Sequence, residues 1–152
     1  MSKVILDLNE HITKNFTWKE AVVSDSYPEL ASKIVITPQH QIKVFYLFRP
    51  LQRVRDRFEL PINTLSCIRT EELNNLIGGV PGSDHLFEGY SAAVDFTFLC
   101  DNSILPDKLE ACFSWIKNTM PYSFGQLILY RERNFIHFSL PTPKHYGEAF
   151  LK

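Results

Sequence analysis

The sequence lacks the features that mark several common classes of protein. No stretch of its 152 residues approaches the roughly 20 apolar residues of a membrane-spanning helix. Positive charge is not in excess, since 16 Lys and Arg stand against 17 Asp and Glu, so a nucleic-acid binder that works by neutralising phosphates is not expected. No internal repeat or long linker is present. We therefore expect a single domain over residues 1–152, with its core from about residue 16 to residue 140.

Cysteine is scarce, and its spacing does not indicate a metal site. Cys67, Cys100 and Cys112 form no C-x-x-C pair, and an odd number without such a pair indicates reduced, mostly buried thiols. The N-terminal run Met1–Leu8 is interrupted by Asp7 and is too short for the apolar core of a signal peptide. We expect synthesis in the cytoplasm without an export signal.

Four segments have the apolar spacing or the end signals of helices. They are residues 17–27, 39–58, 70–77 and 106–120. Thr17 and Glu20 form the pattern of a capping box at the start of the first segment. Pro50 should kink or divide the second, because proline lacks the N–H that a helix interior uses. Gly78 follows the third segment as its C-terminal cap.

Four further segments are predicted to be strands. They are residues 60–66, 92–99, 127–130 and 134–140. The last two are separated only by residues 131–133 and should form a hairpin. Because most helices precede the strands, the pattern predicts an α+β domain with a small antiparallel sheet and with N-terminal and flanking helices. The tail over residues 141–152 is expected to be a surface coil.

Three residues in the second half have the chemistry of a metal site. His85 follows a glycine-rich turn, Asp95 interrupts an apolar strand, and His137 lies in the middle of another strand. A buried carboxylate is unfavourable unless it is paired or bound to a metal, so Asp95 needs a partner. Two histidines and one carboxylate suit a catalytic zinc ion that keeps one position for water. Arg69 is the alternative partner for Asp95, in a metal-free ion pair.

The segments around these residues resemble the zinc D-Ala-D-Ala carboxypeptidase family, which includes phage L-alanyl-D-glutamate endopeptidases and has the Hedgehog/DD-peptidase fold. The family pattern runs S-G-Y-R-S, a short helix with L-N, S-x-H-x-x-G-x-A-x-D, and W-x-H in a late strand. The matching segments are Ser66–Asn74, Ile77–Leu86, Ala93–Phe96 and Phe135–Ser139. The resemblance is closest to the small, phage-type branch.

The resemblance implies a function and assigns residues to it. It implies hydrolysis of amide bonds in peptidoglycan stem peptides or cross-bridges, with one Zn²⁺ bound by His85, Asp95 and His137. Arg69 would recognise a substrate carboxylate or carbonyl, a task suited to a guanidinium group. Ser83 would hydrogen-bond near the zinc or to the substrate. Gln126 matches a recurrent family position, and edge-strand polarity is its alternative explanation.

The loop after His85 departs from the family pattern. Nine residues separate His85 from Asp95, which is more than in the family. The segment Leu86–Ser91 therefore holds an insertion beside the expected metal. Such a loop can reshape substrate access, and it can offer the carboxylate of Glu88 to the metal or to the substrate.

The general base is the second departure. Family enzymes take an acidic base from the segment leading to the last histidine, but Tyr130 and Asn134 stand at the two usual positions. Glu132 is the nearest acid and is the candidate base. Its place in the predicted hairpin turn equally fits a solvated surface charge.

Three hypotheses follow. The first is a monomeric zinc peptidase that reaches the cell wall after lysis, by holin-type release or by virion delivery. The second is a catalytically impaired, zinc-containing protein of the same fold that binds the cell wall or has a structural role. The third is a metal-free domain in which Asp95 pairs with Arg69.

Overall fold

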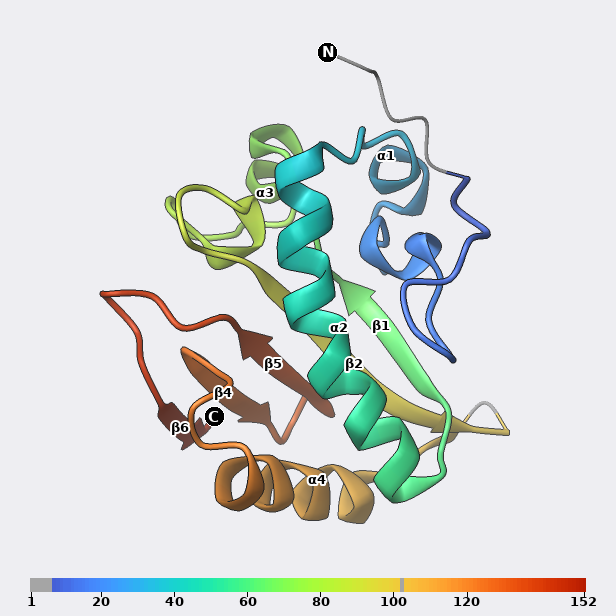
Figure 1. The fold of residues 1–152 in the computed structure, drawn as a ribbon, viewed down its shortest axis with the longest axis vertical. Coiled ribbons are helices and arrows are strands. Elements are labelled where there is room, and N and C mark those ends of the chain that lie inside the picture. The colour runs from blue at the N-terminus through green and yellow to red at the C-terminus, as the bar shows by residue number, and fades with distance from the viewer. Residues whose placement is uncertain (1–6, 102) are drawn as a thin grey trace.

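A mixed β-sheet lies at the centre of the computed structural model, which describes residues 7–101 and 103–152 (Figure 1). Its strands are β1 (Ile62–Ser66), β2 (Ala93–Cys100), β3 (Ser103–Ile104), β4 (Gln126–Tyr130), β5 (Phe135–Ser139) and β6 (Glu148–Leu151). The strand order is β1-β2-β5-β4-β6, and the short β3 pairs with β2. Every pairing is antiparallel except that of β6 with β4. The predicted α+β class is therefore confirmed, with a mixed sheet.

Helices of different lengths surround this sheet. They are the 3₁₀ helices η1 (Trp18–Ala21) and η2 (Asp84–Leu86) and the α-helices α1 (Pro28–Ser32), α2 (Pro38–Phe58), α3 (Glu71–Leu76) and α4 (Pro106–Thr119). The long α2 lies across the sheet (Figure 1), and both α2 and α4 contribute to one continuous apolar core. Within the described residues, no helix combines the length and the apolar character needed to span a bilayer.

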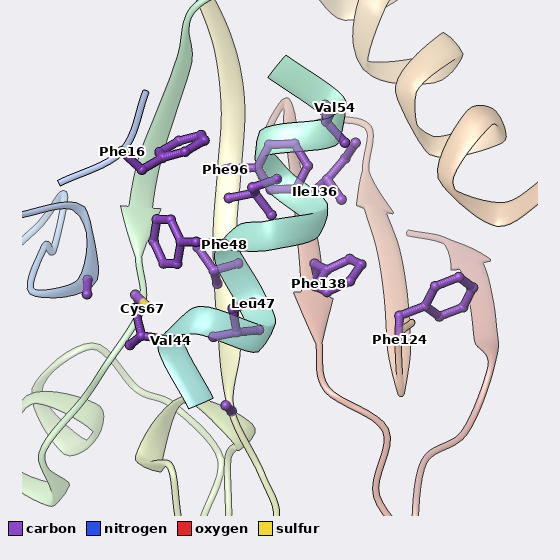
Figure 2. Close-up of a cluster of buried hydrophobic side chains, with 14 of the residues drawn as sticks. Phe16, Val44, Leu47, Phe48, Val54, Cys67, Phe96, Phe124, Ile136 and Phe138 are labelled. Carbon is purple, nitrogen blue, oxygen red and sulfur yellow. The ribbon is translucent and has the colours of Figure 1, made fainter. Parts of the chain in front are cut away.

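The two faces of the sheet differ in chemistry because side chains alternate along each strand. In β2, Phe96 and Phe98 are fully buried in the apolar core. Figure 2 shows Phe96, Phe48 of α2 and Phe138 of β5 in the same cluster of buried side chains. Asp95, between two core residues of β2, points to the opposite face. The alternation thus separates the core from the face that carries the polar site.

The helices follow the sequence pattern with two differences. Thr17 and Glu20 do pair, since the Thr17 N–H donates to the Glu20 carboxylate at 2.8 Å. This pair begins only the short η1, and a separate helix, α1, begins at Pro28. The helix α2 continues through Pro50 and is not divided there.

The prediction of a surface coil over residues 141–152 was wrong, because β6 adds to the sheet. Its register pairs Gln126 with Glu148 and Leu129 with Leu151. The Lys152 N–H donates to the Leu129 carbonyl at 2.9 Å. A parallel partner lies far away in the sequence, so a run of four residues gives little local indication of it. The N-terminal segment used to judge the export signal lies outside the described residues as far as residue 6.

Candidate metal centre

A cavity of about 690 Å³ lies on the polar face of the sheet. Its wall is formed by β2, β4 and β5, by the segment that follows α3, and by the C-terminal segment. It contains nearly all the site residues named from the sequence, namely Arg69, Ser83, His85, Asp95, Gln126 and His137. Glu132 does not line it. The fold thus gathers residues that are separated by as many as 68 positions, from Arg69 to His137.

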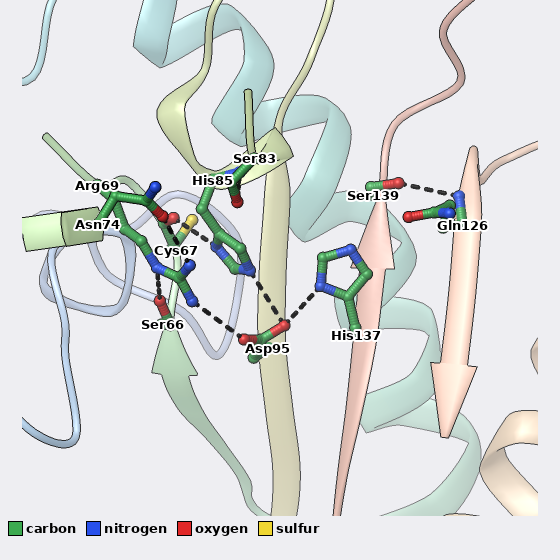
Figure 3. A network of polar contacts seen from close by, with 10 residues as sticks. All are labelled: Ser66, Cys67, Arg69, Asn74, Ser83, His85, Asp95, Gln126, His137 and Ser139. Atoms are coloured by element: carbon green, nitrogen blue, oxygen red, sulfur yellow. Dashed lines mark hydrogen bonds and ion pairs between the residues drawn. The ribbon is translucent and has the colours of Figure 1, made fainter. Parts of the chain in front are cut away.

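His85, Asp95 and His137 converge in this cavity (Figure 3). Asp95 of β2 and His137 of β5 are directly paired across the two strands, so their side chains lie on the same face. Asp95 Oδ1 is 2.8 Å from His137 Nδ1 and 3.2 Å from His85 Nε2. One ligand atom from each residue lies within 4.8 Å of the other two. The three side chains form a group that can hold one metal ion.

The hydrogen bonding of His85 leaves one ring nitrogen available to a metal. Its Nδ1 lies 2.8 Å from the carbonyl oxygen of Cys67, which can only accept, so Nδ1 carries the proton and Nε2 the lone pair. Burial lowers the pKa of His85, which disfavours an imidazolium that donates from both nitrogens. The buried Nε2 has no hydrogen-bond partner and faces Asp95 Oδ1, another electron-pair donor. A cation between these two atoms resolves the repulsion, as in histidines oriented for metal binding.

Asp95 uses its two oxygens differently. Oδ1 faces the histidines, whereas Oδ2 lies 3.6 Å from Arg69 Nη2. Burial by itself raises the pKa of the Asp95 carboxyl, but contributions that include the hydrogen bond from His137 Nδ1 hold this pKa well below its usual value. The carboxylate form therefore dominates at neutral pH. Pairing with Arg69 and ligation of a metal are compatible, because each involves a different oxygen.

Arg69 is fixed in the cavity wall by three side chains (Figure 3). Its Nε donates to Ser66 Oγ at 3.0 Å and its Nη1 to Asn74 Oδ1 at 3.2 Å, and its Nη2 faces Asp95. Asn74 is held in turn, because its Nδ2 donates to the Val80 carbonyl at 3.0 Å. These contacts hold the guanidinium group at a defined place beside the His-Asp-His group.

Ser83 and Gln126 have local roles within the cavity wall. Ser83 Oγ accepts the backbone N–H of His85 at 3.3 Å and thereby caps η2, the short helix that carries this histidine. Gln126 begins β4, and its backbone N–H donates to Ser139 Oγ at 2.9 Å. Its side-chain Nε2 donates to Glu148 Oε2 at 3.1 Å. Both residues therefore support neighbouring groups of the cavity.

The two acids that the sequence offered as partners of the reaction lie elsewhere. Glu132 is exposed in the turn between β4 and β5, and Glu88 is exposed in the loop after η2. Neither residue lines the cavity. Tyr130 does line it, at the end of β4 where the resemblance leads one to expect an acid.

His145 is a cavity residue that the sequence analysis missed. It lies in the segment between β5 and β6, which was expected to be coil. Its Nδ1 is 3.0 Å from Glu148 Oε2, a residue of β6. The spacing of a histidine three residues before an acid is too common to indicate a site, so only the unpredicted β6 could have revealed this pair.

Comparison with known proteins gives a family. A family model described as Peptidase M15 matches residues 6–139. The match spans most of the chain and includes all three members of the His-Asp-His group. No curated protein and no solved structure matches the chain.

Proposed function

This chain belongs to the peptidase M15 family, and on that basis we propose that it is a zinc-dependent peptidase that cleaves amide bonds in peptidoglycan stem peptides or cross-bridges. The observation that best supports a metal enzyme is the buried Nε2 of His85. It lacks a hydrogen-bond partner and faces the carboxylate of Asp95. Within the family, the resemblance of segments Ser66–Asn74 and Ile77–Leu86 favours the small, phage-type branch.

The metal would be held by His85, Asp95 and His137. A zinc ion bound there supplies Lewis acidity, which polarises a carbonyl group and lowers the pKa of a water molecule. Three protein ligands leave a position open, as catalytic zinc sites require. All three ligands come from one chain, so we propose that a monomer is active.

Arg69 would orient the substrate. Its guanidinium group is held by Ser66 and Asn74 and needs little reorganisation to bind a carboxylate or carbonyl of the peptide. Such positioning accelerates a reaction by holding the scissile bond in the right place. Ser83 would contribute a hydroxyl group on the same side as His85. Gln126 would act indirectly, through the carboxylate of Glu148.

Proton transfer is the step in which Glu132 is expected to act. Glu132 would have to reach the cavity from an exposed turn, so its role as the base requires the β4–β5 turn to fold over the site. A direct test is the substitution Glu132→Gln. If Glu132 is the base, this variant cleaves peptides with a much lower kcat than wild type and binds the same amount of zinc.

The proposed function is tested by incubating zinc-loaded protein with purified peptidoglycan and analysing the released peptides. We expect cleavage that a chelator abolishes and zinc restores, and that His137→Ala eliminates. His11→Ala is the matched control, because His11 is exposed and does not line the cavity. A folded, zinc-loaded wild-type protein that releases no peptide would overturn the proposal.

A second candidate function is a zinc-containing protein of this fold that binds the cell wall without cleaving it. The observation that favours it is Tyr130, which lines the cavity where an acid is expected. This candidate predicts one zinc ion per chain and cosedimentation with peptidoglycan, without release of peptides.

A further inference from the structure

The C-terminal segment brings a second polar group into the cavity, next to β4. The parallel pairing of β4 and β6 sets Glu148 beside Gln126. Glu148 Oε2 accepts from Gln126 Nε2 at 3.1 Å and contacts His145 Nδ1 at 3.0 Å. His145 and Gln126 both line the cavity that contains His137. A histidine with a carboxylate on one ring nitrogen is therefore part of the same wall as the metal ligands.

The proton positions in this pair follow from its contacts. The hydrogen bond from Gln126, and then that from His145, lower the pKa of Glu148 below its usual value. An ionised carboxylate only accepts, so His145 Nδ1 carries the proton. In the neutral imidazole, Nε2 then has a free lone pair. The same use of a carboxylate to fix the tautomer of a catalytic histidine occurs in hydrolases with Ser-His-Asp triads.

The loop that carries His145 is held by its backbone. The His145 N–H donates to Thr142 Oγ1 at 3.0 Å, and the Thr142 N–H donates to the His145 carbonyl at 2.8 Å. Gly125 lies directly under this loop, since a Cβ atom there would come within 2.8 Å of the same carbonyl. The imidazole is not needed for these contacts. Its replacement should therefore leave the loop in place.

The other acids of the cavity wall are less suited to proton transfer. They are Asp25 and Asp84, apart from Asp95 of the metal group. Imidazole is the side chain that most often serves as both general base and general acid in enzymes. Among the groups that line the cavity and lie outside the metal group, His145 combines this chemistry with an orienting partner.

We propose that His145 transfers the proton in the peptidase reaction, a role that rests on the proposed function. His145 Nε2 takes a proton from the attacking water as the water oxygen bonds to the scissile carbonyl carbon. It then gives this proton to the amide nitrogen as the C–N bond breaks, which leaves a carboxyl group and a free amine. Glu148 keeps the proton on Nδ1 and stabilises the imidazolium form. The histidine–glutamate pair of the C-terminal segment would thus act in place of the acid that the family pattern puts before the last histidine.

The first test compares His145→Gln and His145→Ala with wild type in the hydrolysis of a peptidoglycan stem peptide. We expect kcat to fall by about 100-fold or more, as general acid–base catalysis predicts, with zinc content and thermal unfolding unchanged. His11→Gln is the matched control and should keep wild-type kcat. A kcat within about threefold of wild type in both His145 variants would overturn the role of His145, since proton transfer is worth far more.

The second test does not depend on activity. Nitrogen-15 NMR of the histidine side chains in the zinc-loaded protein should show neutral His145 with its proton on Nδ1. Glu148→Gln, which removes the negative charge beside Nδ1, should lower kcat while the protein keeps its zinc. A neutral wild-type His145 with its proton on Nε2 would overturn the proposal, because Nε2 then has no lone pair for a proton.

The two proposals can fail separately. A wild-type enzyme that cleaves peptides while His145→Ala is equally active leaves the peptidase function standing and removes only the role of His145. A zinc-loaded wild-type protein without any cleavage overturns the peptidase function and the role of His145 together.

Discussion

The side chain of Asn74 fills the space that a Cβ atom on Gly79 would occupy. Asn74 is buried, with its amide nitrogen on the Val80 carbonyl and its oxygen on Arg69 Nη1 at 3.2 Å. Gly79 therefore contributes to the position of Arg69 as well as to the turn after α3. Without a side chain at residue 79, Asn74 can lie flat against the backbone and hold Arg69.

Substitution of this glycine should disturb the position of Arg69. In Gly79→Ala, the new methyl group displaces the Asn74 amide, and overpacking of this kind costs about 1–3 kcal/mol. We expect a lower free energy of unfolding and a higher KM for peptide substrates, because Arg69 is expected to bind rather than to react. Thermal unfolding and steady-state kinetics measure the two effects.

A double-mutant cycle provides the control. In the Asn74→Ala background the amide is absent, so the additional Gly79→Ala substitution should cost much less stability than it does in wild type. Equal costs in the two backgrounds would show that the methyl group acts on something other than Asn74.

Much of the fold could be predicted because its signals are local. The hairpin of β4 and β5, the capped helix α3 and the buried strand β2 each have a pattern within one short segment. Asp95 was identifiable as a site residue because a carboxylate stands in an otherwise apolar strand. His85 and His137 became interpretable only beside it and through the family resemblance, since an isolated histidine in an apolar segment has common structural explanations.

The parts that could not be predicted depend on contacts between distant segments. The apolar residues Ile42, Phe45 and Tyr46 fit a helical spacing, yet all three are exposed in α2. Its buried face instead consists of Val44, Leu47, Phe48, Leu51 and Val54. The helix has apolar residues on more than one side, so only the packed sheet decides which side is covered. The position of His145 likewise depends on the parallel pairing of β6 with β4.

Zinc should stabilise the folded chain. A ligand that binds only the native state adds about 4 kcal/mol when its free concentration exceeds Kd by about 1,000-fold. We expect a higher melting temperature with zinc and one bound ion per chain. His137→Ala should abolish both effects because it removes one of the three ligands, whereas His11→Ala should retain them. Identical melting curves with zinc and with chelator would contradict the metal site.

The cysteines should differ in reactivity. Cys67 and Cys112 are fully buried, and burial raises the pKa of both thiols, so neither forms a reactive thiolate in the native state. Cys100 is partly exposed near the end of β2. Iodoacetamide followed by mass spectrometry should label Cys100 alone in the folded protein and all three cysteines after unfolding. Rapid labelling of Cys112 in the folded protein would contradict the packing of α4 on the sheet.

Proline substitutions can test whether β6 contributes to stability. The Glu148 N–H donates to the Gly125 carbonyl and the Lys152 N–H to the Leu129 carbonyl, each at 2.9 Å. Because N–H groups alternate in direction along a strand, the N–H of Phe150 also points to β4 and that of Ala149 points away. Phe150→Pro removes a hydrogen bond of the ladder, whereas Ala149→Pro leaves the ladder intact.

Phe150→Pro should therefore unfold at a lower temperature than Phe150→Ala, which loses the same aromatic ring and keeps the N–H. The free energies of unfolding of these two variants should differ by about 1–3 kcal/mol, which is the cost of leaving the facing carbonyl of β4 without its donor. Ala149→Pro should lie close to wild type, since edge strands tolerate proline on their outward side. Ala149→Pro is compared with wild type and Phe150→Pro with Phe150→Ala. Equal losses of stability in the two comparisons would show that the backbone of β6 does not pair with β4 in this register.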